Sequence, residues 1–194
     1  MAEFLYDGPK IEFTPRCIIL KSDPSLENYL AEHRNGFQSV DVSDLGITIV
    51  HTSLPQPHAG SEAEYFEETF DGQFCGVIGR GRYTSAHSHK ENDNPELSIS
   101  EKYQVIGKLA VYQKGSGWKM VSGTFEEPGE LDIPAGVPHF GHAVDKSAIT
   151  MITMRNAERY SRDEWHIPVP NQQAFKNSAM LEFFTSSPED RKIQ

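Results

Sequence analysis

The segment from residue 81 to residue 155 consists of short apolar runs that alternate with polar residues and are separated by Gly, Pro, Asn and Asp. Such alternation suits strands with one side against a core, and closely spaced turn residues favour strands over helices. The runs cover residues 103–112, 118–125, 130–136 and 147–155. Their spacing is typical of antiparallel sandwiches and barrels, so the segment predicts an all-β core.

The residues before this segment predict further strands and one helix. Residues 11–20 and 47–53 are rich in β-branched and apolar side chains, as expected of strands, and residues 73–79 form a third candidate that its glycines weaken. A helix is expected between the first two strands, because Asp23 can cap it and Pro24 suits its first position. Asn35 and Gly36 are expected to end it.

Helical patterns return after the β-rich segment. A short helix is expected near residues 161–165 and an amphipathic helix near residues 171–184, where Phe175, Ala179 and Phe183 form one stripe. No repeat, linker or low-complexity tract divides the chain. We therefore expect one domain over residues 1–194, with a barrel core at about 73–155, an N-terminal extension at 1–72 and a C-terminal helical extension at 156–194.

The charge balance excludes several classes of partner. With 18 Lys and Arg against 28 Asp and Glu, the chain has a formal net charge of −10, so it lacks the basic surface that binds nucleic acids.

Its two cysteines, Cys17 and Cys75, are too few and too far apart for a disulfide framework or a Cys-x-x-Cys site. No apolar run approaches the ~18 residues of a membrane span, and the N-terminus lacks a signal-peptide pattern. We expect a cytoplasmic protein that binds neither nucleic acid nor membrane.

Two histidines, His87 and His89, are separated by one residue in the sequence GRYTSAHSHK. On a strand, residues i and i+2 point to the same face about 6–7 Å apart, so both imidazoles can approach one metal ion. This pair alone is weak evidence, because ordinary structural histidines are the commoner explanation. A second segment, PGELDIPAGVPHFGH, contains a turn at Pro134 and Gly136 that returns His139 at the start of a new strand. The two segments in this order, separated by a β-rich stretch, are much more specific than either alone.

In these segments the sequence resembles the cupin superfamily. Gly81, His87 and His89 match the opening of the first cupin motif, and Pro134, Gly136 and His139 match the middle of the second, with Gly129 one residue closer than the usual glycine. The resemblance covers about residues 81–155. It implies a small antiparallel β-barrel of the double-stranded β-helix, or jelly-roll, type with a metal ion bound inside.

The acidic metal ligand that the resemblance implies does not stand at its usual place. The sequence KENDNPELSIS intervenes before Glu101, and we interpret it as an enlarged loop with Glu101 as the fourth ligand. Strand alternation supports this choice, because Glu101, Tyr103 and Val105 share one face. Glu91 is the runner-up, since it would alternate inward with the two histidines, and Gln104 or a site without an acidic ligand are further alternatives.

The second motif also departs from the cupin pattern, because Ala143 stands where an Asn is usual and His142 follows His139 after three residues. A neutral imidazole suits proton transfer near neutral pH, so His142 is a candidate for moving a proton near the metal, although a structural role is the commoner one. Tyr103 is a second candidate for the same role.

Three imidazoles and one carboxylate would hold a divalent ion with a net charge of +1 and leave coordination positions open. We expect Fe(II), but Mn, Ni, Co or Zn would also accept these ligands, because ligand type alone does not select among them. Such an ion can polarise a carbonyl, bind an enolate or catecholate, or activate oxygen.

Aromatic and apolar residues near the expected ligands suggest a pocket for a compact, unsaturated molecule rather than a polymer. The candidates for contact with a substrate are Tyr83, Phe140, Val105 and Met151.

The leading hypothesis is a metal-dependent cupin enzyme with Fe(II) oxygenase activity on a small unsaturated or enolisable substrate. The alternatives are a non-oxidative isomerase, cyclase or lyase, and a cupin that binds a small ligand without catalysis. A homodimer is also expected, since cupins commonly pair through their sheets.

Overall fold

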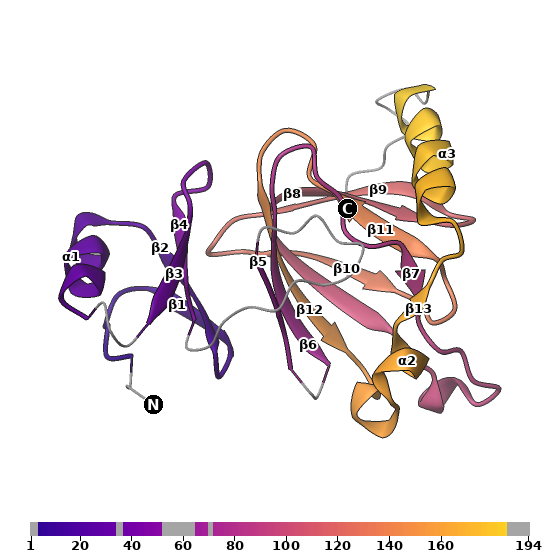
Figure 1. The fold of residues 1–194 in the computed structure, drawn as a ribbon, viewed down its shortest axis with the longest axis horizontal. Helices are drawn as coiled ribbons and strands as arrows, with labels where there is room; N and C mark the ends of the chain where they lie inside the picture. The colour runs from indigo at the N-terminus through magenta and orange to yellow at the C-terminus, as the bar shows by residue number, and fades with distance from the viewer. Residues whose placement is uncertain (1–3, 34–36, 52–64, 70–71, 186–194) are drawn as a thin grey trace.

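A computed structural model describes residues 4–33, 37–51, 65–69 and 72–185 and shows two antiparallel sheets (Figure 1). The first sheet has the strand order β1-β2-β4-β3. Its elements are β1 (Lys10–Thr14), β2 (Cys17–Lys21), β3 (Gln38–Val42) and β4 (Ile47–His51), and the helix α1 (Pro24–Glu32) lies between β2 and β3 in the sequence.

The expected single strand over residues 11–20 is instead a tight hairpin, and this part of the prediction is wrong. Pro15 has no N–H to donate to a strand partner, which favours a turn at this point. The hydroxyl of Thr14 accepts hydrogen bonds from the amides of Arg16 and Cys17, at 3.2 and 2.9 Å. The chain therefore reverses, and Ile11 pairs with Ile19.

The helix of the N-terminal part begins as predicted. The carboxylate of Asp23 accepts a hydrogen bond from the amide of Leu26 at 2.8 Å, and Pro24 is the first residue of α1. This arrangement satisfies one of the amides that a helix start leaves unpaired. The expected stop at Asn35 and Gly36 lies outside the described residues.

The second sheet contains the predicted all-β core. Its strand order is β13-β7-β11-β8-β12-β6-β5, and β9 and β10 also pair with β8. The strands are β5 (Tyr65–Glu68), β6 (Gln73–Ile78), β7 (His87–Ser88), β8 (Glu101–Gln113), β9 (Gly117–Gly123), β10 (Gly129–Ile133), β11 (His139–His142), β12 (Ala148–Met154) and β13 (Ile167–Pro168). The short helix α2 (Arg162–Trp165) and the longer α3 (Gln172–Thr185) flank β13 in the sequence, near the predicted positions.

The long strand β8 gives this sheet its curl. Its first half pairs with β10 and β12, whereas its second half pairs with β9 and β11. The change falls at Gly107, whose φ of +91° is a backbone conformation that glycine adopts without strain. A Cβ atom there would lie 2.8 Å from the carbonyl oxygen of Ser147. The all-β, antiparallel fold class predicted from the sequence is confirmed.

The two faces of the curled sheet carry different cores. Tyr103, Val105 and Leu109 belong to a buried cluster on the inner face. Ile149 and Met151, on the outer face, belong to a second cluster that also contains residues of the N-terminal sheet, namely Cys17, Ile19, Val42, Ile47 and Ile49. The N-terminal sheet therefore buries its apolar side against the barrel strands (Figure 1).

The helix α3 covers another part of the outer surface, over β9 and β11. Trp118 and Phe140 pack with Ala179 and Phe183 of the predicted apolar stripe. The indole N–H of Trp118 donates a hydrogen bond to the carbonyl of Ala179 at 2.8 Å. Among the described residues, no helix is both long and apolar enough to cross a membrane.

The single-domain prediction can be tested because both tryptophans of the chain, Trp118 and Trp165, lie outside the N-terminal sheet. Ile49 is fully buried between that sheet and the barrel, so Ile49→Ala should cost about 2–5 kcal/mol. If the chain unfolds as one unit, the midpoint of urea unfolding followed by tryptophan fluorescence falls accordingly. Ser39→Ala, at an exposed position of the same sheet, should leave it unchanged. A tryptophan midpoint insensitive to Ile49→Ala would mean two independent units.

Candidate metal centre

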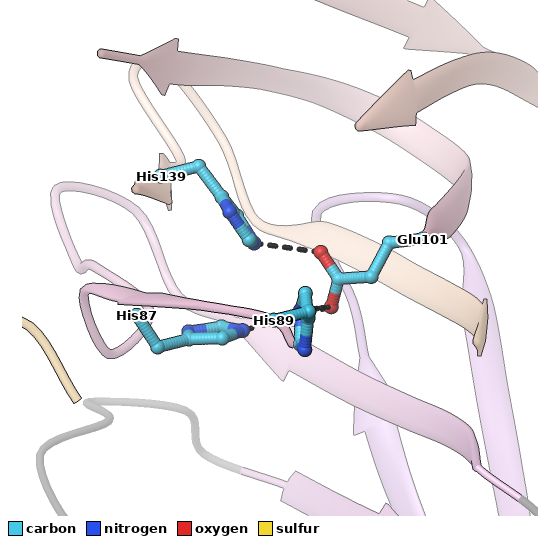
Figure 2. A group of neighbouring side chains, drawn as sticks. All are labelled: His87, His89, Glu101 and His139. Carbon is cyan, nitrogen blue, oxygen red and sulfur yellow. Dashed lines mark ion pairs between the residues drawn. The ribbon is translucent and has the colours of Figure 1, made fainter. Parts of the chain in front are cut away.

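Four side chains meet inside the curled sheet, two from β7 and the residue that follows it, one from β8 and one from β11 (Figure 2). His87, His89, Glu101 and His139 are all buried, and each offers a ligand atom within 4.8 Å of the others. The Nε2 atoms of His89 and His139 lie 2.8 and 2.6 Å from the two carboxylate oxygens of Glu101. The Nε2 atom of His87 lies 3.6 Å from the nearer oxygen.

Strand pairing and one turn bring these residues together. His87 of β7 pairs directly with His139 of β11, so both side chains stand on one face. Glu101 opens β8. The turn at Gly136, where φ is +74°, directs its amide to the carbonyl of His89 at 2.9 Å. The turn of the second motif thus holds the backbone of the first.

Each of the three histidines uses its Nδ1 atom to hydrogen-bond a backbone carbonyl. His87 bonds to Ser85 at 3.1 Å, His139 bonds to Val137 at 2.8 Å, and His89 bonds to Trp165. Because a carbonyl only accepts, each Nδ1 carries the proton when the ring is neutral. The lone pair of each Nε2 atom then points toward the centre, in the form that binds metal ions.

Three of the atoms at the centre have no hydrogen-bond partner among the described residues when the imidazoles are neutral. The Nε2 atoms of His89 and His139 and Oε2 of Glu101 are buried and unsatisfied within the part of the chain that is described. Nitrogen lone pairs therefore face carboxylate lone pairs at short range, which is unfavourable for buried acceptors. A divalent cation satisfies all of these atoms at once, so the residues fit a metal ion.

Burial and charge act against each other at these groups. Burial, together with the neighbouring His139, lowers the pKa of His87 to about 4. Burial also lowers the pKa of His89, but the charge and hydrogen bond of Glu101 outweigh it and raise that pKa. Burial raises the pKa of Glu101, yet His89 and His139 bring it well below its ordinary value. The centre therefore favours a carboxylate beside a positive charge.

A cavity of about 40 Å³ adjoins three of the four residues, His87, His89 and Glu101. Its lining also includes the apolar side chains of Phe74, Ile78, Tyr103, Ile152 and Trp165, together with Gly76, Thr84, Ser85, Thr150 and His166. Space of this size holds a few water molecules. No lysine or arginine is among the described residues that line the cavity.

The structure places Glu101, rather than either alternative, beside the histidines. Glu91 is exposed and lies against the turn, where a Cβ atom at Gly136 would meet its carboxylate. The amide of Gln104 donates to Glu130 at 3.1 Å on an exposed part of the sheet. Neither belongs to the group of four.

Tyr103 lies where the sequence predicts and lines the cavity. Its ring centroid is 6.4 Å from that of His139. Burial, with the negative charge of Glu101, raises the pKa of its phenol well above the ordinary value. The neutral phenol of Tyr103 can donate a hydrogen bond. Val105 belongs to the same inner core without lining the cavity.

His142 does not reach the centre, which corrects its predicted role. It stands three residues after His139 on β11, and an odd offset turns a side chain to the opposite face of a strand. Its ring stacks on Tyr83 with centroids 4.4 Å apart, and its Nδ1 atom bonds to the carbonyl of Arg82 at 3.1 Å.

Three predicted substrate contacts are also corrected, because their side chains pack outside the cavity. Tyr83 and Phe140 pack in the cluster beneath α3. Met151 packs under the N-terminal sheet, whereas its neighbours Thr150 and Ile152 line the cavity. Residues of β12 alternate between the two faces of the sheet, and Met151 lies on the outer one.

The cavity also contains residues that the sequence analysis did not select. His166 stacks on His87 with ring centroids 4.4 Å apart, and its Nε2 atom lies 3.4 Å from the hydroxyl of Ser85. Trp165 supplies the carbonyl that His89 bonds. The motif resemblance ends near residue 155, so no spacing pattern connected these C-terminal residues to the site.

Comparison with models of protein families gives no match, and no curated protein matches the chain. Solved structures do. A cupin 2 conserved barrel domain protein from Rhodopseudomonas palustris matches with a TM-score of 0.43 and 14% identity, over 67% of this chain and 87% of that one. A cupin-like protein from Thermotoga maritima matches with a TM-score of 0.39 and 15% identity, over 64% and 96%.

The capsular polysaccharide assembling protein CapF from Staphylococcus aureus matches with a TM-score of 0.43 and 15% identity, over 61% of this chain. The chain spans only 34% of the length of CapF. It also spans 37% of a chain from crystal structures of the DMSP lyases RdDddP and RnDddQII, with a TM-score of 0.33. The motif spacing, the curled antiparallel sheet and the buried group of three histidines and one glutamate give this chain a cupin-like fold with a site that could hold a metal ion.

Metal binding should stabilise the protein through these four residues. An ion present at about 100 times its Kd stabilises by about 2.7 kcal/mol, which corresponds to a rise in Tm of roughly 5–11 °C for a chain of this size. We expect this rise on adding Co(II) to protein first treated with a chelator, measured by thermal unfolding.

His139→Ala should lose the rise in Tm, whereas His142→Ala, in the same strand but on the other face, should keep it. Comparing each variant with and without the ion removes any destabilisation caused by the substitution itself. An equal rise in both variants would contradict the site.

Proposed function

We propose that the chain is a metal-dependent enzyme that acts on a small unsaturated or enolisable substrate, with Fe(II) oxygenase activity. The observation that carries the proposal is the orientation of the three imidazoles. Their Nδ1 atoms bond to carbonyls and leave Nε2 toward Glu101, beside a mostly apolar cavity. Imidazole and carboxylate ligands suit Fe(II).

A divalent ion held by His87, His89, Glu101 and His139 would supply a net charge of +1 and the ability to polarise or activate a bound oxygen atom. The protein's own groups then determine what binds beside it. Phe74, Ile152 and Trp165 exclude water from one side of the cavity. The hydroxyls of Thr84 and Ser85 and the ring of His166 offer hydrogen bonds to a polar group of the substrate.

The charge of the cavity favours a substrate with at most one negative charge, located next to the metal. No lysine or arginine lines the described cavity, so a distant phosphate or second carboxylate would be buried without a partner, which is costly. The small cavity volume favours a compact molecule. These two properties support an enolate, a catecholate or a similar compound.

Oxygen dependence tests the activity. We expect Fe(II)-loaded protein to consume oxygen when supplied with a panel of compact enols and catechols, beginning with acetylacetone and catechol, in an oxygen electrode. His139→Ala should abolish this uptake, and His142→Ala should retain it.

Two other outcomes would replace the oxygenase proposal. Equal turnover of a compound in the absence of oxygen would favour the non-oxidative isomerase, cyclase or lyase, in which the metal stabilises an enolate. Binding of the compounds without any product, in either atmosphere, would favour a ligand-binding cupin. Elemental analysis of protein purified without a histidine tag identifies the natural metal.

A further inference from the structure

The strand that carries His87, with His89 just beyond its end, is unusually short. β7 consists of His87 and Ser88 alone, and its pairing with β11 is the single match of His87 with His139. A strand of this length gains little from its own ladder. Its other neighbour therefore also contributes to its position.

That neighbour is the segment of residues 164–172, which we call the C-terminal strap. β13 of the strap pairs with β7, placing Ile167 opposite Ser88 and Pro168 opposite His87. The amide of Val169 donates to the carbonyl of Ala86 at 3.0 Å, and the side-chain oxygen of Gln172 accepts from the amide of Ala86 at 3.1 Å.

Side chains extend this contact at both ends of β7. Lys90 forms an ion pair with Glu164 at 2.5 Å. His166 stacks on His87 and approaches Ser85. The strap thus has contacts from Ser85 to Lys90, and β7 and β13 lie side by side in Figure 1.

The three histidines differ in where their carbonyl partners come from. His87 bonds to Ser85 and His139 bonds to Val137, each two residues earlier in the same segment. His89 bonds instead to Trp165, 76 residues further along the chain. Local backbone therefore orients two rings, whereas the strap orients the third.

The strap is itself firmly attached to the barrel. The ring of Trp165 packs against Phe74 with centroids 5.5 Å apart. Beyond the strap, α3 is attached through the hydrogen bond from Trp118 to Ala179. These contacts make the carbonyl of Trp165 a fixed acceptor.

We propose that the C-terminal strap is a positioning element of the metal centre, which keeps the proton of His89 on Nδ1 and holds β7 in register. The proposal rests on the metal centre of the proposed function, but on no particular reaction. Partners that orient a metal-binding histidine typically change metal affinity about 10–100-fold when they are lost.

Gln172 offers a test with a matched control. Gln172→Ala removes the acceptor for the amide of Ala86, whereas Gln172→Glu keeps an oxygen there. Gln173→Ala removes a neighbouring amide that bonds to Asn177 on the exposed side of α3. Val169→Pro is a stronger change, because it removes the amide that donates to Ala86.

We expect Gln172→Ala and Val169→Pro to weaken Co(II) binding about 10-fold, at the lower end of the range for such partners, and to change the visible absorption spectrum of bound Co(II). Gln172→Glu and Gln173→Ala should match the unmodified protein. The Co(II) affinity is measured by competition with a chelator. The temperature is kept below the unfolding temperature of every variant, so that unfolding does not contribute to a loss of affinity.

A second measurement needs no metal. Long-range ¹H–¹⁵N correlation spectra of the metal-free protein report which nitrogen of His89 carries the proton. At a pH where the ring of His89 is neutral, we expect Nδ1–H in the unmodified protein and a mixture of tautomers in Val169→Pro. An unchanged Co(II) affinity and spectrum in Val169→Pro, or an unchanged His89 tautomer, would overturn the proposal. If the unmodified protein bound no Co(II), the proposed function would fail, whereas the tautomer measurement would still decide the role of the strap.

Discussion

The buried carboxylate of Glu101 is the group on which the site depends. Its two oxygens lie within 2.6–2.8 Å of imidazole nitrogens that carry no proton when the rings are neutral. Such a cluster of acceptors costs energy unless a positive charge joins it. The barrel holds this cluster together, because β8 places Glu101 while β7, the residue after it and β11 place the histidines. The surrounding core buries these atoms away from solvent that would otherwise satisfy them.

Strand periodicity made much of this predictable from the sequence. The spacing of His87 and His89, the turn before His139 and the inward face of β8 placed four residues that the structure brings together. The prediction of one strand over residues 11–20 is wrong because Pro15 interrupts the β-branched and apolar positions on either side of it. Met151 was misassigned because the alternation of β12 does not itself say which set faces inward, and both sets are buried.

Burial of both faces is the physical reason for that ambiguity. The outer face of the barrel strands is covered by the N-terminal sheet on one part and by α3 on another. Apolar residues are then required on both sides, and the usual contrast between a buried and a solvated face disappears. His142 and Phe140 illustrate the consequence, since they resemble cavity residues in sequence but fill the outer cluster.

The C-terminal extension shows why the motifs alone do not define the centre. The two motifs lie within residues 81–155, yet the hydrogen-bond acceptor of His89 and part of the cavity wall come from Trp165 and His166. Contacts between segments this distant in the chain leave no periodic signal in either. The short strand β7 has one metal-binding residue at its start and another just beyond its end. It must nevertheless be held on both edges, because unpaired edge groups leave its position undetermined. The strap meets that requirement, and so the metal centre is complete only when the extension has folded against the barrel.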